Sequence, residues 1–190
     1  PFHVALGDVD GDGDQDVIVG NEAGASVSVY TNDGGLLAAP VDYAGPELPV
    51  KGIGLGDFDN DGDLDIIAHY ADTDLIGVYL NDGAGGFGDT DALPARLFSN
   101  AALADPQGEF AVADLDGDGF ADFALADASG AVVFMANNGN LTFSAATTIN
   151  IGDGIVGVHL VDVDTDDVRD LVVVRDSSDD ADDGLYIYTG

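Results

Sequence analysis

The sequence predicts an all-β protein built from four copies of one repeat. A nine-residue acidic motif, Asp-x-Asp-x-Asp-Gly-x-x-Asp, recurs at intervals of 49, 57 and 48 residues, with one change in the last copy. Each copy precedes a short apolar run rich in β-branched residues, which is typical of a buried strand and too short for a helix. The repeat period indicates one array of similar units rather than unrelated domains.

Each repeat is predicted to contain strands in a fixed order around its acidic loop. A strand rich in small residues comes before the loop, the apolar strand comes after it, and an alternating third strand follows. Three repeats then carry an Asn-Asp-Gly or Asn-Asn-Gly turn, in which we expect left-handed backbone conformations. The first strands cover residues 4–7, 52–56, 110–113 and 158–161, the second strands 17–19, 66–68, 123–125 and 171–174, the clearest third strands 27–30 and 78–80, and the turns 32–34, 81–83 and 137–139.

The acidic loops have the composition of calcium sites. Positions 1, 3, 5 and 9 offer carboxylates, and Gly stands at position 6 of three loops, where a positive φ is expected. Alternate carboxylates in a tight loop can surround a hard cation, and calcium takes about six to eight oxygens. We expect position 7 to add its main-chain carbonyl, and water or a bidentate carboxylate to complete the shell. Magnesium, which is smaller and dehydrates reluctantly, fits such a cage less well.

The sequence thus predicts about four bound Ca²⁺ ions, one in each loop. The fourth loop is expected to bind most weakly, because Asp167 replaces the Gly at position 6. The predicted ligands are Asp8, Asp10, Asp12, Asp14 and Asp16; Asp57, Asp59, Asp61, Asp63 and Asp65; Asp114, Asp116, Asp118, Phe120 and Asp122; and Asp162, Asp164, Asp166, Val168 and Asp170.

The main competing interpretation is an EF-hand or dockerin-type loop, which begins in the same way. Such a loop requires a bidentate acid at position 12 and a helix on each side. Position 12 is apolar in all four copies and lies within a predicted strand, which excludes this class. The residues are Val19, Ala68, Leu125 and Val173.

A calcium loop followed by a buried strand resembles the FG-GAP repeat of integrin α-subunit β-propellers and the similar VCBS-type repeats of bacterial and archaeal surface proteins. The resemblance covers essentially the whole chain. It implies a β-propeller of four-stranded antiparallel blades, in which each loop joins the first two strands and lies on the face opposite the main ligand surface. Small residues in the first strands suit the crowded centre of such a ring. We place the blades at about residues 1–49, 50–106, 107–153 and 154–190.

The last blade is expected to lack its outer strand. The sequence stops at Gly190, where the turn to a fourth strand would begin, and only residues 1–2 precede the first strand. Propellers of the resembling family usually close with about seven blades. We therefore expect the remaining blades to come from the same longer polypeptide, which is the favoured interpretation, or from homo-oligomerisation.

Composition limits the partners and the location. The formal net charge is −33, with 37 acidic and four basic residues, so nucleic acid and anionic membranes are disfavoured as partners. There is no cysteine and no uninterrupted apolar stretch of about 18 residues, which argues against a disulfide framework and against membrane insertion. Calcium is scarce in the cytosol. We therefore expect a secreted, extracellular or cell-surface location, in a marine or halophilic prokaryote.

Three function classes remain open. The first is a calcium-stabilised adhesion or recognition module for a protein or glycan. Its ligand contacts are expected from residues 36–51, with Tyr43 and Pro46, and from residues 86–108, with Phe87, Arg96 and Phe98. The second is a propeller enzyme that degrades polysaccharide, with His3, His69 beside Tyr70, or His159 as candidate catalytic groups. The third is a structural subunit of a surface assembly or filament. No nucleophile elbow, zinc motif or phosphate loop is present, so we expect a non-enzyme in which His3 and His159 pack on inner strands and His69 ends a second strand.

Overall fold

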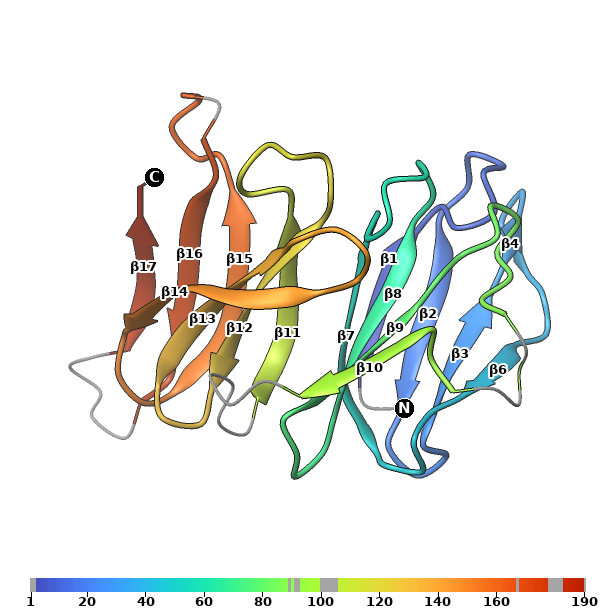
Figure 1. The fold of residues 1–190 in the computed structure, drawn as a ribbon, viewed down its shortest axis with the longest axis horizontal. Coiled ribbons are helices and arrows are strands. Elements are labelled where there is room, and N and C mark those ends of the chain that lie inside the picture. Colours follow the sequence, from blue (N-terminus) through green and yellow to red (C-terminus); the bar gives the residue numbers. More distant parts are fainter. Residues whose placement is uncertain are drawn as a thin grey trace.

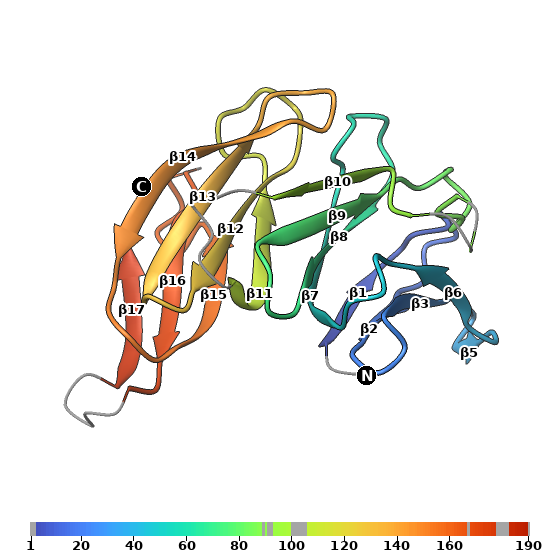
Figure 2. The same ribbon diagram turned by 60° about the horizontal axis from the view of Figure 1, so that its bottom comes forward.

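The computed structural model describes residues 3–88, 90, 93–99, 106–166, 168–177 and 183–189. Four antiparallel sheets stand side by side in chain order, from the blue first sheet to the red last one (Figures 1 and 2). This is a four-blade β-propeller arrangement, and it confirms the predicted fold class. Within the described ranges, no helix has the length and apolar character needed to cross a membrane.

Within the residues that the structure describes, three blades have four strands and the last has three, as the sequence predicts. The strands are, in order across each sheet, β1 (His3–Gly7), β2 (Asp16–Asn21), β3 (Ser26–Tyr30) and β6 (Val41–Ala44); β7 (Val50–Gly56), β8 (Asp65–Tyr70), β9 (Leu75–Tyr79) and β10 (Arg96–Ser99); β11 (Pro106–Ala113), β12 (Asp122–Asp127), β13 (Ala131–Asn137) and β14 (Phe143–Asn150); and β15 (Ile155–Val161), β16 (Asp170–Arg175) and β17 (Gly184–Tyr188). A separate hairpin joins β4 (Asn32–Asp33) to β5 (Leu36–Leu37).

The acidic loops all connect the first and second strands of a blade, and they lie along the upper edge in Figure 1. The register closes each loop at its base, because the last Asp of the motif pairs with the residue just before the first Asp. In the first blade this pair is Gly7 and Asp16. The others are Gly56 with Asp65, Ala113 with Asp122, and Val161 with Asp170.

The innermost strands of neighbouring blades contact one another, which explains their small residues. A Cβ added at Gly54 would lie 2.7 Å from the Phe110 Cβ, and one at Gly56 would lie 2.6 Å from a Val112 methyl. Any larger side chain here would push β7 away from β11. The predicted crowding at the centre of the blades is confirmed.

The core consists of layers between adjacent blades. The layer between the first two blades contains the buried rings of Tyr43, Tyr79 and Phe87, and the next is centred on Phe58 and Phe123. The layer between the third and fourth blades contains smaller residues. Stability therefore depends on blade-to-blade packing, as in other repeat arrays.

The turns after the third strands differ from the prediction. Only the Gly of each triplet has a positive φ, at Gly34 (62°), Gly83 (78°) and Gly139 (74°). The Asn that begins each triplet has an ordinary backbone and uses its polar groups in hydrogen bonds to the acidic loops. The prediction of a left-handed conformation for these Asn residues is therefore wrong.

Candidate metal centres

The first Asp of each motif folds the loop around itself. In the first loop, Asp8 Oδ1 accepts from the Gly11 amide at 2.8 Å and Oδ2 accepts from the Gly13 amide at 2.9 Å. Asp114 makes the same pair of bonds. Asp57 accepts from the amides of Asp61 and Gly62, and Asp162 accepts from those of Thr165 and Asp166. The backbone amides thus point inward and hold the carboxylate at position 1.

The last Asp of each motif is fully buried and fastens the loop to its blade. Asp16 accepts from the Val9 amide at 2.8 Å and from the Asn32 amide, beyond the third strand, at 2.7 Å. Asp65 and Asp122 repeat both bonds with Phe58 and Asn81, and with Leu115 and Asn137. An ionised carboxylate has about four acceptor sites, so position 9 can still coordinate a cation while it makes these bonds.

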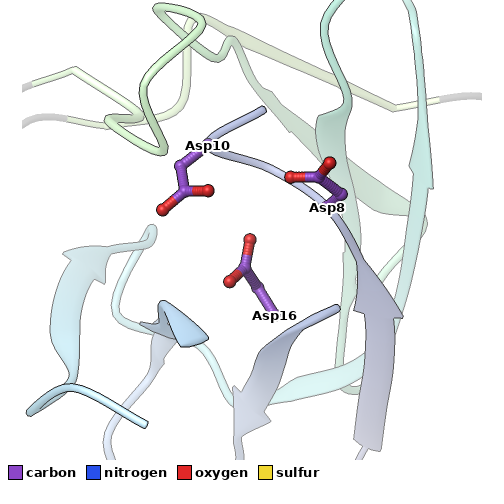
Figure 3. A group of neighbouring side chains, drawn as sticks. All are labelled: Asp8, Asp10 and Asp16. Atoms are coloured by element: carbon purple, nitrogen blue, oxygen red, sulfur yellow. The ribbon is translucent and has the colours of Figure 1, made fainter. Parts of the chain in front are cut away.

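Three carboxylates converge in each of the four loops. Their oxygens lie within 4.8 Å of one another, and Figure 3 shows those of Asp8, Asp10 and Asp16 directed toward a shared space. Positions 1, 3 and 9 meet in the first, third and fourth loops, whereas positions 1, 3 and 5 meet in the second. The other groups are Asp57, Asp59 and Asp61; Asp114, Asp116 and Asp122; and Asp162, Asp164 and Asp170.

The remaining predicted ligands lie outside these triads. At position 5, Asp12, Asp118 and Asp166 each accept from the amide two residues later. Asp65 holds its loop through the two amides described above. The position-7 residues Asp14, Asp63, Phe120 and Val168 were predicted to ligate through their carbonyls, and this stays a prediction. Asp14 uses its side chain to accept from the Gly34 amide at 2.6 Å.

The triads place like charges close together. Burial, and then the neighbouring Asp61 and Asp57, raise the pKa of Asp59. Burial raises the pKa of Asp65 to about 7, although the amides of Asn81 and Phe58 oppose the shift. Burial likewise raises the pKa of Asp122. Carboxylates in this arrangement repel one another, and a bound cation would relieve the repulsion.

The second loop gives the clearest test of whether a cation fits. Asp59 Oδ1 is buried, and among the described residues it has no hydrogen-bond partner. Leaving a buried carboxylate oxygen unsatisfied is costly. The surrounding donors are all oxygen, which suits a hard cation such as Ca²⁺ better than Zn²⁺ or copper. The residues present therefore fit calcium.

The fourth loop differs from the others at a position that the sequence analysis overlooked. Position 4 has a positive φ in every loop, and it is occupied by Gly11, Asn60, Gly117 and Thr165. Thr165 has a φ of 67°, which is strained for a β-branched residue. Asp167, on which the expected weakness of this loop was based, lies outside the described residues.

A chain of side-chain amides links neighbouring loops, and the sequence analysis missed it. The Asn81 amide donates to Leu64 O in its own loop at 3.0 Å and to Val9 O in the preceding loop at 2.7 Å. Asn137 links Ala121 O to Phe58 O in the same way. The signal in the sequence is an Asn that follows the last Asp of its own loop by 16 residues at Asn81 and by 15 at Asn137.

The candidate catalytic residues do not form a common site. His69 and Tyr70 are adjacent on β8, and both are buried. Their side chains contact different residues. His69 Nε2 lies 3.0 Å from Gly108 O, whereas the Tyr70 hydroxyl lies 3.0 Å from that of Tyr79. The packing role predicted for His159 is wrong, because this residue is exposed on β15. His69 lies near the end of β8, the second strand of its blade, as predicted.

The aromatic residues expected to contact ligand are instead part of the core. Tyr43 is buried with its ring edge-on to Phe87, at a centroid distance of 5.6 Å. Phe98 stacks on Phe143 at 4.8 Å. The exposed apolar residues of the first predicted ligand segment are Leu36, Leu37 and Val41.

Comparison with known proteins identifies the repeat. The family model described as FG-GAP-like repeat matches residues 8–68 and 114–173, which together make up more than half of the chain. A search of curated proteins finds no match.

Solved structures with a TM-score above 0.5 share the fold. BBS1N in complex with ARL6DN superposes with a TM-score of 0.59 at 12% identity, covering 100% of this chain and 53% of that one. An Agrocybe aegerita lectin that recognises non-reducing terminal N-acetylglucosamine gives 0.57 at 20% identity, covering 97% and 48%. The V. cholerae biofilm matrix protein Bap1 gives 0.47 at 18% identity, covering 90% and 28%. The chain thus spans about half the length of the first two, and these identities establish a common fold alone.

Proposed function

The chain belongs to the FG-GAP-like repeat family, and we propose that it is a calcium-stabilised β-propeller module that recognises a protein or glycan outside the cell. The observation that carries the proposal is the convergence of three carboxylates in every loop, at the same end of every blade. Four independent copies of one arrangement favour a structural ion in each loop over a single reaction centre. A catalytic metal also needs an open coordination position.

Calcium would be held by the convergent carboxylates, with further oxygens from positions 5 and 7 of each loop. When bound, it supplies the positive charge that offsets the repulsion within each triad. The protein's own residues set up the site: backbone amides orient the carboxylate at position 1, and the buried Asp at position 9 joins the loop to the strands. Four ions would change the net charge from −33 to about −25.

Recognition is proposed for the segments between blades, one of which is bonded to the first acidic loop through Gly34 and Asp14. Leu36 and Leu37 are the most exposed apolar pair there, on a hairpin outside the main sheet of the first blade. This exposed surface supports binding of a protein or glycan. The separation of the candidate catalytic residues supports binding of that ligand rather than its degradation. A location in a calcium-rich, saline environment outside a prokaryotic cell agrees with the acidic surface, because salt screens its self-repulsion.

The ion count tests the metal part of this proposal. Isothermal titration with Ca²⁺ should give about four sites per chain. The variant Asp59→Asn, which keeps the shape of the side chain but removes one ligand charge, should lose one of them. Asp33→Asn, an exposed Asp outside the loops, should keep all four. A count of zero for the native chain would contradict the calcium assignment.

The recognition part needs a separate experiment. A glycan array probed with the native chain in millimolar calcium should show binding that Leu36→Asp together with Leu37→Asp abolishes, with the ion count unchanged. Hydrolysis of an arrayed polysaccharide would instead favour the enzyme alternative.

A further inference from the structure

Two buried asparagines lie between the first three acidic loops. The exposed fraction is 6% for Asn81 and 1% for Asn137. Each one stands at the end of the third strand of its blade, where its main-chain amide donates to the last Asp of its own loop. The side-chain amide of the same residue donates to a carbonyl of the preceding loop. Each asparagine is therefore bonded to two candidate metal centres at once.

The acceptor in the first loop lies between two candidate ligands. Val9 separates Asp8 from Asp10, and its own amide donates to Asp16 at 2.8 Å. These three carboxylates form the triad of the first loop. The Val9 carbonyl accepts from Asn81 at 2.7 Å. The two polar groups of the Val9 main chain are thus held by different blades, the amide by the triad and the carbonyl by the second blade.

The second and third loops are joined by two bonds. Phe58 occupies the same position as Val9, and its carbonyl accepts from Asn137 at 2.9 Å. Beside this bond, the Ala121 amide of the third loop donates to Asp57 O of the second loop at 2.8 Å. Asp57 belongs to the triad of the second loop. The third blade is therefore bonded directly to a candidate ligand of the second.

We propose that Asn81 and Asn137 are positioning residues that couple calcium binding among the first three loops, so that occupancy of one loop raises the calcium affinity of the next. The inference rests on the calcium sites of the proposed function. In an empty loop the carboxylates repel one another, and the segment that contains Val9 or Phe58 is less ordered. Binding in one loop orders this segment together with its asparagine, so the neighbouring loop has less to order when it binds. By thermodynamic linkage the coupling is equal in both directions.

Repulsion between bound ions acts in the opposite direction. Each occupied loop reduces the negative potential that attracts the next cation. In about 1 M sodium chloride the Debye length is about 3 Å, so this repulsion is screened, whereas buried hydrogen bonds are not affected. Cooperativity that persists at high salt is therefore the signature of the asparagine links.

Three glycines report the three loops separately. Gly13, Gly62 and Gly119 stand at position 6, and the amide of each donates to the first Asp of its own loop. Calcium titration of the isotopically labelled native chain in about 1 M sodium chloride, followed by NMR, should shift all three amide signals along curves steeper than that of a single site. If none of the three signals moves, the calcium sites of the proposed function are contradicted. If all three follow independent single-site curves, the calcium sites stand and the coupling is contradicted.

Asn81→Ala should separate the first loop from the other two. The Gly13 signal should follow a single-site curve, with an affinity at least about fivefold lower than in the native chain. Gly62 and Gly119 should still titrate together, because Asn137 is unchanged. Ion-induced folding of the whole chain would keep all three signals together, so continued titration of Gly13 with Gly62 would overturn the proposal.

Asn32→Ala is the matched control. The main-chain amide of Asn32 donates to Asp16 and its side chain donates to Gln15 O, both in its own loop. In the part of the chain that the structure describes, these hydrogen bonds stay within the first blade. The three glycine signals should therefore remain coupled in this variant, and their separation would contradict the role assigned to Asn81.

Asp59→Asn tests the same link without a change at either asparagine, and it serves if circular dichroism shows that Asn81→Ala is unfolded. Removal of a ligand from the second loop should weaken calcium binding in the first and third loops at least about fivefold, as read from Gly13 and Gly119. Unchanged affinities in those two loops would overturn the proposal.

Discussion

The side-chain amide of Asn81 donates to the main-chain carbonyl of Val9 at 2.7 Å and so joins the acidic loop of the second blade to that of the first. Both residues are buried. The next interface repeats the bond, from Asn137 to Phe58 O at 2.9 Å. The acidic loops of the first three blades are therefore connected from one blade to the next.

Replacement of Asn81 by Ala should destabilise the protein by about 3 kcal/mol, because it leaves the carbonyls of Val9 and Leu64 buried without their donor. Urea unfolding in saturating calcium measures the change. Asn138→Ala is the matched control, since that exposed amide bonds only to nearby Thr142 and Ser144 among the described residues, and its loss should change stability by less than about 0.5 kcal/mol. Equal losses from both variants would remove the role assigned to Asn81.

Thr165→Asn should stabilise the fourth loop by about 1 kcal/mol, because Asn adopts the left-handed conformation more easily than a β-branched residue. Asn60 already occupies the same position in the second loop at a φ of 62°. The reverse change, Asn60→Thr, should destabilise by a similar amount. Thermal melts of the two variants measure these changes in stability. A loss of stability in Thr165→Asn would contradict the prediction and would show that the threonine side chain is needed there.

Without calcium, the protein should lose stability as the pH rises from about 4 to 7. The pKa of Asp65 is raised to about 7 in the folded chain, above its ordinary value of 3.8, and that of Asp122 is raised in the same direction. A folded state that binds protons more tightly than the unfolded state is favoured at low pH, and this advantage is lost as the pH passes the folded pKa. Urea midpoints in excess chelator should fall across this range. A urea midpoint that rises with pH would contradict the predicted loss of stability.

The sequence was sufficient for the architecture because its signals are local. The Asp-rich loops, the small residues of the first strands and the apolar second strands each follow from spacing within one repeat. Convergence of positions 1 and 3 also follows from spacing, as in the triad of Asp8, Asp10 and Asp16.

Contacts between blades were not predictable in this way. Asn81 meets Val9 across 72 residues of sequence, and Tyr43 meets Phe87 across an interface, so no short pattern marks either pair. The burial of the aromatic residues Tyr43 and Phe87 therefore has no signal in the local sequence. The strain at Thr165 was missed for a different reason, since Gly11, Asn60 and Gly117 mark position 4 as left-handed only when the four loops are compared.

The most direct measurement is the thermal midpoint of the native chain in millimolar Ca²⁺ and in excess chelator, at equal sodium chloride. A ligand that binds only the folded state stabilises it, and the empty triads repel internally, so the midpoint should fall sharply when calcium is removed. Magnesium at the same concentration should restore little of the loss. An unchanged midpoint in chelator would contradict the assignment of the four Asp triads as structural calcium sites.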